Sequence, residues 1–184
     1  MKTEIERRKP DGLIDYLALA LTTFGVGYIP GAPGTYGSAV GVLIYLFFGF
    51  RESYIAAYFL STEQVFPISV FWSINAVLLT VLCLLGIWAS GRSTQIFGTD
   101  DPHEAVVDEV LGQLITFAFV PFGIGWPLIL AGFILFRLFD IWKPYPIDNL
   151  QNLPGGLGIC ADDLVAGVYA GICLSVIYAI MMSL

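Results

Sequence analysis

Long apolar runs, separated by short polar or Gly/Pro-rich segments, organise this chain of 184 residues. No charged residue occurs in 16–50, 110–136 or 164–184, and Glu63 is the only one in 53–91. A membrane-spanning helix needs about 20 mostly apolar residues, so each run is long enough to supply one. The pattern predicts an all-α fold: a membrane-associated or multi-pass bundle of about six helices joined by Gly/Pro-rich loops.

Helix-breaking residues and charges set the expected limits of these helices. Proline lacks the backbone N–H and glycine is costly inside a helix, so "GVGYIPGAPGTYGSAVG" (25–41) and "PFGIGWP" (121–127) interrupt two of the runs. Arg51 and Glu52 mark a membrane interface after the second helix. The expected helices are 13–24, 36–49, 66–90, 105–120, 127–142 and 163–183. The halves on either side of 121–127 are short, which leaves open a shallow hairpin or two crossings.

The composition narrows the class of protein. Hydrophobic residues make up 57% of the chain and charged residues 12%, which places it in or against a membrane. A net charge of −7 excludes nucleic-acid binding, because that needs a basic surface. We expect one domain over 1–184, with a polar segment at 1–12 that lacks the features of a signal peptide. The three cysteines are widely separated without CxxC spacing, so neither disulfides nor thiolate metal sites are expected.

Basic residues predict the orientation in the membrane. Lys and Arg in short flanking segments stay on the cytoplasmic side. Arg7, Arg8 and Lys9 therefore place the N-terminus inside. Arg92 and Lys143, which flank the acidic segments, favour the same side for both.

Nine of the fifteen acidic residues lie between residues 100 and 163, a concentration that indicates a bound cation. Asp108 and Glu109 stand directly before twenty-seven uncharged residues. Adjacent positions on a helix point about 100° apart, and a carboxylate in lipid is costly. At least one of the two acids should therefore face a polar interior or a cation.

A carboxylate and two cations meet near the end of the expected helix 127–142. Arg137 and Asp140 are three residues apart and share a helical face. Pro144 disfavours the helical conformation at Lys143, so the helix should end there. Such a grouping suits a phosphate beside a metal, because carboxylates bind a hard cation while Arg or Lys takes the remaining phosphate charge.

Two more acids, Asp162 and Asp163, open the last expected helix after a glycine-rich approach. An Asp before an apolar run is commonly an N-cap, but capping alone is an incomplete account of two adjacent ones. The candidate Mg²⁺ ligands are thus Asp108, Glu109, Asp140, Asp162 and Asp163. The alternative is a set of interfacial acids and helix caps.

Missing motifs narrow the phosphate chemistry. No cysteine has an arginine six residues later, and His103 is the one histidine, which excludes cysteine phosphatases and histidine-nucleophile lipid phosphatases. The aspartyl-nucleophile DxDx[TV] motif, the CDP-alcohol transferase pattern and a P-loop are also absent. Metal-assisted attack by water remains. His103, alone beside Pro102, is more typical of a surface or capping residue than of a catalytic one.

Four blocks, "PGAPGTYGS", "VVDEVLGQ", "FRLFDIWKPYPI" and "GGLGICADDLVAG", occur in this order between about residues 22 and 171. In these blocks, above all FDIxKPxPI followed by GGxGIxxDD, the chain resembles the phosphatidylglycerophosphatase A family of bacterial lipid phosphatases. The resemblance implies an all-α bundle and a Mg²⁺-dependent hydrolase at the cytoplasmic face of the bacterial inner membrane. Its reaction would convert phosphatidylglycerophosphate and water to phosphatidylglycerol, the precursor of cardiolipin, and phosphate.

The residue patterns and the resemblance together assign roles and partners. The expected catalytic acids are Asp108, Glu109, Asp140 and Asp163, and Asp162 joins them as a metal ligand. The expected phosphate-binding residues are Gly34, Thr35, Ser38, Arg137 and Lys143. The expected partners are the phospholipid substrate and membrane lipids, and part of the apolar exterior could instead be buried in a homodimer.

The segment 25–41 has two interpretations. It could be a loop that only joins two helices. Beside an anionic substrate, its glycines would let backbone N–H groups approach phosphate, and Thr35 and Ser38 would add hydroxyl donors where the helix dipole favours anions.

Two other functions remain open. Buried acids in broken apolar helices also mark ion pathways, so a small membrane transporter is the main alternative. Against it, the acids cluster at expected helix ends on one side of the membrane, and the two helix interruptions show no repeat relation. A non-catalytic member of the family is disfavoured because no block has lost its acid.

Overall fold

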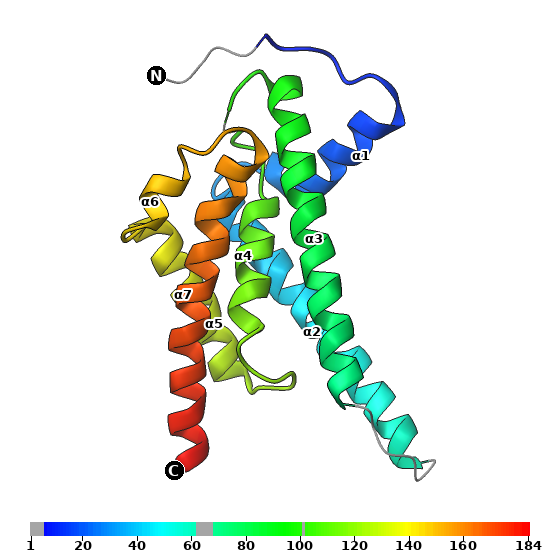
Figure 1. Cartoon of the computed structure of the whole chain (residues 1–184), viewed down its shortest axis with the longest axis vertical. Coiled ribbons are helices and arrows are strands. Elements are labelled where there is room, and N and C mark those ends of the chain that lie inside the picture. Colours follow the sequence, from blue (N-terminus) through cyan, green and yellow to red (C-terminus); the bar gives the residue numbers. More distant parts are fainter. Residues whose placement is uncertain (1–5, 62–67, 101) are drawn as a thin grey trace.

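The computed structural model describes residues 6–61, 68–100 and 102–184, and the regular structure in them is all helical (Figure 1). The elements are α1 (Gly12–Thr23), the 3₁₀ helix η1 (Val26–Tyr28), α2 (Pro33–Ser61), α3 (Ile68–Phe97), α4 (Val107–Phe117), α5 (Trp126–Trp142), α6 (Ile147–Leu150) and α7 (Gly156–Ser183). The six expected helices are all present, and α6 and η1 are additional short turns. The predicted all-α fold is confirmed.

Three helices, α2, α3 and α7, are long and apolar enough to cross a membrane, with 29, 30 and 28 residues. They expose many large apolar side chains, such as Leu43, Leu84 and Ile180. Helices α2 and α3 run in opposite directions, and their lower ends diverge from α7 in Figure 1. An apolar exterior of this extent fits lipid.

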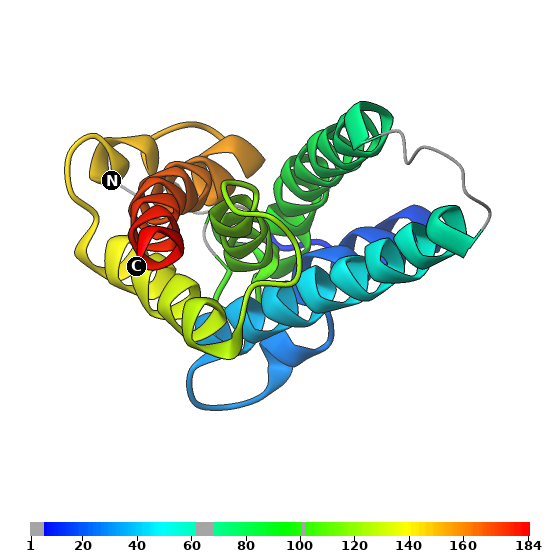
Figure 2. The same cartoon turned by 90° about the horizontal axis from the view of Figure 1, so that it is seen from below.

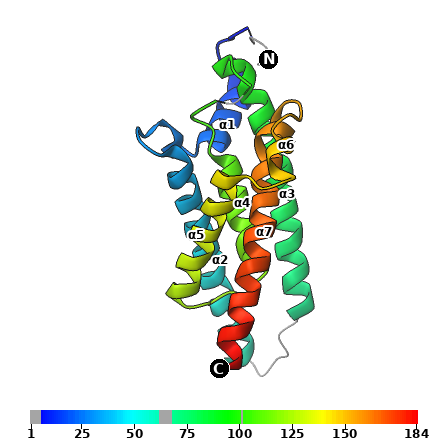
Figure 3. The same cartoon turned by 90° about the vertical axis from the view of Figure 1, so that its left-hand side faces the viewer.

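Helix α4 lies at the centre of the bundle, with α2, α3, α5 and α7 packed around it (Figures 2 and 3). Eight of its 11 residues are buried. A helix of this length extends about 16 Å, too short to cross a bilayer. The run 110–136 is therefore a hairpin in which α4 is a core helix and α5 returns along its side.

Glycines bring α4 and α7 into close contact. A Cβ at Gly167 would collide with the carbonyl oxygen of Gly112. A Cβ at Gly112 would press against the Phe136 ring and the carbonyl oxygen of Asp163. Small residues let helix backbones approach closely in membrane bundles. This contact places the first turn of α4 beside the acids of α7.

Helix α2 approaches α4 through a second set of glycines, at the end of the segment 25–41. It begins at Pro33, three residues earlier than expected, because proline fits the first position of a helix. A Cβ at Gly34 would strike the Glu109 carboxylate, and one at Gly37 would strike Val106. The glycines here serve helix packing, a role that neither interpretation of the segment had included.

The expected end of the second helix at Arg51 and Glu52 is wrong, since α2 continues to Ser61. The Arg51 guanidinium donates to Asn75 Oδ1 at 3.0 Å and lies 5.4 Å from the Phe48 ring centre. These contacts accommodate the charge inside the α2–α3 pair, so the charge does not end the helix.

The expected start of the last helix is also wrong. Helix α7 begins at Gly156, so Asp162 and Asp163 lie well inside it and do not cap it. Gly155 adopts a positive φ of 63° just before the helix, a conformation that glycine reaches without strain. A Cβ at Gly156 would collide with the Ile87 carbonyl oxygen, so the glycine-rich approach is a tightly packed helical turn.

Candidate functional site

Three carboxylates converge where α4 begins. Asp108 and Glu109 occupy the first turn of α4, where the helix dipole favours negative charge, and Asp163 projects from α7. One oxygen from each of the three lies within 4.8 Å of the others. Carboxylate oxygens grouped in this way are the ligands that hard divalent cations prefer.

Two further acids lie beside this group, and each is paired with a cation. Arg137 Nη1 lies 2.5 Å from Asp140 Oδ2 and 4.0 Å from Glu109 Oε1. Lys143 Nζ lies 2.6 Å from Asp162 Oδ2. The five predicted ligands therefore divide into a group of three acids and two ion-paired acids at its edge.

The end of α5 places Lys143 toward α7. The helix ends at Trp142, as Pro144 predicts, and the Lys143 N–H donates to the Phe139 carbonyl at 2.9 Å. Lys143 has a φ of 46°, a left-handed conformation that is uncommon for residues other than glycine. This turn directs its ammonium to Asp162, and such backbone strain is found mainly at functional sites.

The start of α2 forms the wall on the other side of Glu109. The Ser38 hydroxyl donates to the Gly34 carbonyl at 3.0 Å and accepts from Arg137 Nη1 at 3.5 Å. Gly34 itself lies against the Glu109 carboxylate. The structure thus brings Gly34 and Ser38 to the acids. Thr35 is half-buried, and within the described residues no hydrogen bond joins its side chain to them.

Burial disfavours the charged form of these acids when no cation is bound to them. The pKa of Asp108 is raised well above its usual range, first by burial and then by the Glu109 charge, and burial likewise raises the pKa of Glu109. Asp108 Oδ1, Glu109 Oε2 and Asp162 Oδ1 are buried, and no hydrogen-bond partner for them occurs in the described parts of the chain. A divalent cation would satisfy these oxygens and offset their repulsion, so the residues fit a metal.

The sequence patterns do not single out Gln113, which lies one turn after Glu109 on α4. Its side chain is fully buried, and neither carboxamide atom has a partner among the described residues. A polar residue inside an uncharged run, four positions after an acid, is the signal that could have identified it. His103 is exposed in the turn before α4, as expected of a surface residue.

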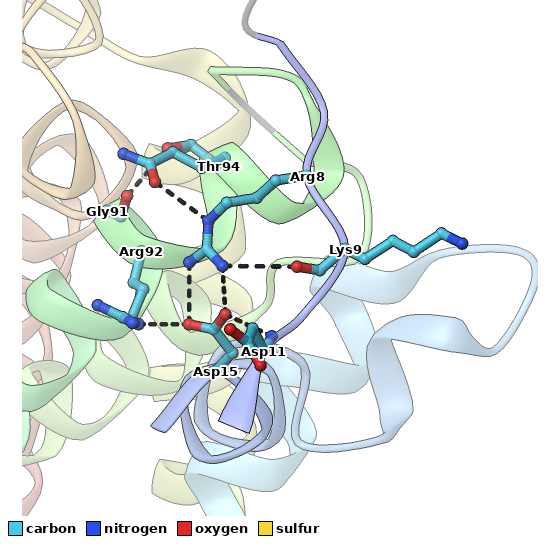
Figure 4. Close-up of polar contacts among 8 residues, drawn as sticks. Arg8, Lys9, Asp11, Asp15, Gly91, Arg92 and Thr94 are labelled. Carbon is cyan, nitrogen blue, oxygen red and sulfur yellow. Dashed lines mark hydrogen bonds and ion pairs between the residues drawn. The ribbon is translucent and has the colours of Figure 1, made fainter. Parts of the chain in front are cut away.

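A second buried carboxylate, Asp15 on α1, lies outside this site (Figure 4). It accepts hydrogen bonds from both terminal nitrogens of Arg8, from Arg92 Nε at 2.5 Å and from the backbone N–H of Asp11 at 2.8 Å. The Arg8 contact is the main cause that lowers the pKa of Asp15. This carboxylate is fully paired by the protein itself.

Comparisons with known proteins agree with the family resemblance that the four sequence blocks indicate. A sequence model of phosphatidylglycerophosphatase A matches residues 19–178. A protein of Bacteroides thetaiotaomicron, provisionally named phosphatidylinositol-3-phosphatase, is 36% identical over 84% of this chain and 89% of its own length. The phosphatidylglycerophosphatase A of Haemophilus influenzae is 35% identical over 97% of this chain and 96% of its own length. That of Escherichia coli is 30% identical over 79% and 73%.

No solved structure matches the chain. The family match covers most of the chain and includes α4, α5 and the acids of α7. The chain belongs to the phosphatidylglycerophosphatase A family.

Proposed function

We propose that this protein is a Mg²⁺-dependent lipid phosphatase that hydrolyses phosphatidylglycerophosphate to phosphatidylglycerol and inorganic phosphate. The observation that carries the proposal is the convergence of Asp108, Glu109 and Asp163 within 4.8 Å, with Arg137 and Lys143 at their edge. Two relatives that share this family are named phosphatidylglycerophosphatase A.

Asp108, Glu109 and Asp163 would hold the metal, because their oxygens converge and some of them have no other partner in the described residues. When bound, Mg²⁺ would activate water and offset negative charge on the phosphoryl group. Asp140 and Asp162 complete the acidic set. Both are held in ion pairs with Arg137 and Lys143, and a bound phosphate would share these cations.

The remaining residues bind the phosphate. Arg137 has several N–H donors and would pair with two phosphate oxygens. The Ser38 hydroxyl, which accepts from Arg137 Nη1 and donates to the Gly34 carbonyl, would hold the guanidinium in place. Lys143 would neutralise a third oxygen from the α7 side. A carboxylate of the acidic set would accept the proton of the attacking water as its oxygen bonds to phosphorus. The bond between phosphorus and the glycerol oxygen then breaks, and this oxygen would take up the proton that the carboxylate returns.

The position of the site supports the cytoplasmic face of the bacterial inner membrane. The acids come from the N-terminal end of α4, the C-terminal end of α5 and the first half of α7, and the N-terminal end of α2 lies beside them in the upper part of Figure 1. Arg8, Arg92 and Lys143 lie toward the same end, and basic flanks favour the cytoplasm. Acids gathered at one end, away from the middle of the spanning helices, favour an enzyme over a transporter.

Phosphate release by the purified full-length protein in detergent tests the proposal. We expect release from phosphatidylglycerophosphate that EDTA abolishes and Mg²⁺ restores. Phosphatidylinositol 3-phosphate is the comparison substrate, because one relative carries that name. Faster release from the inositol lipid would overturn the substrate assignment, and release from neither lipid would overturn the phosphatase itself.

A further inference from the structure

Helix α5 carries a continuous apolar face that points away from the bundle. The exposed large hydrophobic side chains on this helix are Trp126, Leu130, Ile134, Leu138, Ile141 and Trp142. With 17 residues, α5 extends about 25 Å, close to the thickness of the hydrocarbon core. Its two exposed tryptophans lie at opposite ends, and tryptophan is enriched at both membrane interfaces. This face is therefore suited to contact with lipid.

A shallow, open groove lies on this face, and its lining residues all come from α5. It is lined by Ile134, Arg137, Leu138, Ile141 and Trp142. Arg137 also borders the acids, with its Nη1 2.5 Å from Asp140 and 3.5 Å from the Ser38 hydroxyl. One guanidinium thus forms the boundary between an apolar groove open to the bilayer and a buried acidic cluster.

We propose that this groove holds an acyl chain of the lipid substrate, which enters the site sideways from the bilayer along α5. The inference rests on the proposed phosphatase function. A phospholipid keeps its tails in the hydrocarbon while its terminal phosphate must reach the acids, so its path has to be apolar along one side and cationic at its end. The groove provides both features, with Ile134 and Leu138 for the chain and Arg137 for the phosphate.

A second apolar cavity, between other helices, does not meet this requirement. It encloses about 170 Å³ between α2, α3 and α4, with Tyr45, Trp72, Leu114 and Phe117 in its lining. On α4, Leu114 points about 140° away from Glu109, because each residue turns the helix by about 100°. That cavity therefore faces away from the acids, and none of its lining residues belongs to the candidate site.

Substitutions that fill the groove without adding polarity test the proposal. Leu138→Trp and Ile134→Trp are compared with Leu84→Trp, a change at an exposed apolar position on α3. Each purified variant is assayed on long-chain phosphatidylglycerophosphate and on its water-soluble short-chain analogue. Filling the groove should lower the ratio of long-chain to short-chain kcat/KM by about tenfold, the loss of roughly two buried methylene contacts. The α3 variant should keep the wild-type ratio, and an equal ratio in all variants would overturn the proposal.

Photo-crosslinking gives a second readout that does not depend on catalysis. The wild-type protein is irradiated with a phosphatidylglycerophosphate that carries a diazirine in one acyl chain, and the labelled peptides are identified. We expect label on α5 around Leu138 that unlabelled substrate displaces. Label confined to α3 or to the α2–α3–α4 cavity would contradict the groove. A wild type that releases no phosphate would refute the proposed function, whereas an active wild type with undisplaced or absent α5 label would refute only this inference.

Discussion

Buried carboxylates occur at two sites in this protein, and the sites differ in how their negative charge is balanced. In the group on α1, Asp15 alone faces two arginines, Arg8 and Arg92, and a backbone N–H (Figure 4). In the group on α4, α5 and α7, five carboxylates face one arginine and one lysine. The pKa of Asp15 is lowered, whereas the pKa of Asp108 is raised.

The difference separates a carboxylate that the protein itself pairs from a candidate metal-binding site. The Asp15 cluster connects the segment before α1 to α3 and leaves its carboxylate satisfied. In the acidic cluster, burial and mutual repulsion disfavour the charged form, and the proposed divalent cation would offset both. Burial alone therefore does not distinguish the two sites. They differ in the number of cations that face each acid.

Asp163→Asn should cause the largest loss of phosphate release. Loss of one metal-binding oxygen should lower phosphate release by about 100-fold or more, above the range typical of residues that only support a ligand. In EDTA the same variant should melt at a higher temperature than the wild type, since one buried negative charge is gone. Asp108→Asn serves as the parallel variant. Full activity in both would show that the metal-site assignment is wrong.

Asp15→Asn should have the opposite effects on stability and activity. It leaves Arg8 and Arg92 without their shared acceptor, so the thermal midpoint should fall while activity per folded molecule is retained. Because folding lowers the pKa of Asp15, its stabilisation is complete above about pH 4 and is lost as the pH falls further. Melting curves from pH 7 to pH 3 should show the variant approaching the wild type at the acid end. A constant gap across this range would contradict the assignment.

Gly34→Ala should affect the acidic cluster alone. The new methyl group would displace the Glu109 carboxylate, so we expect a clear loss of kcat with little change in the thermal midpoint. The matched control is Gly49→Ala on the same helix, where a Cβ meets only ordinary contacts with Phe122. The control should be neutral or more stable by up to about 1 kcal/mol. Equal activity in both variants would remove Gly34 from the site.

The smallest effect is expected for His103→Ala. The side chain is exposed and, in the described residues, forms no hydrogen bond or ion pair with either cluster. Phosphate release and its pH profile should match those of the wild type. A large loss of kcat would show that the acids do not act without a histidine.

The sequence predicted which segments form helices better than it predicted where those helices begin and end. Apolar runs indicated every long helix, since lipid exposure leaves a strong compositional signal. The end of α2 was missed because Arg51 finds Asn75 and two aromatic rings within the bundle. The start of α7 was missed because Gly156 is required for packing, while local rules interpret such glycines as loop.

Contacts between residues that are distant in the sequence account for the features of the fold and the site that the sequence did not predict. Arg92 reaches Asp15 from 77 positions away, and nothing local in the sequence indicates that pairing. By contrast, the i,i+3 spacing of Arg137 and Asp140 predicted that they share a helical face, and in the structure they form an ion pair. The division of the five acids into a group of three and two ion pairs also depends on the α4–α7 crossing, which only the folded chain shows.

Metal-dependent thermal stability tests the central claim most directly. Melting of the wild type and the Asp163→Asn and Asp15→Asn variants is followed in EDTA and with increasing Mg²⁺. We predict that Mg²⁺ stabilises the wild type, by about 2.7 kcal/mol at a concentration 100 times its Kd, and gives Asp15→Asn a similar upward shift from a lower baseline. Asp163→Asn should lose most of the shift. An equal shift in Asp163→Asn, or none in the wild type at millimolar Mg²⁺, would contradict the assignment of the acidic cluster as a metal site.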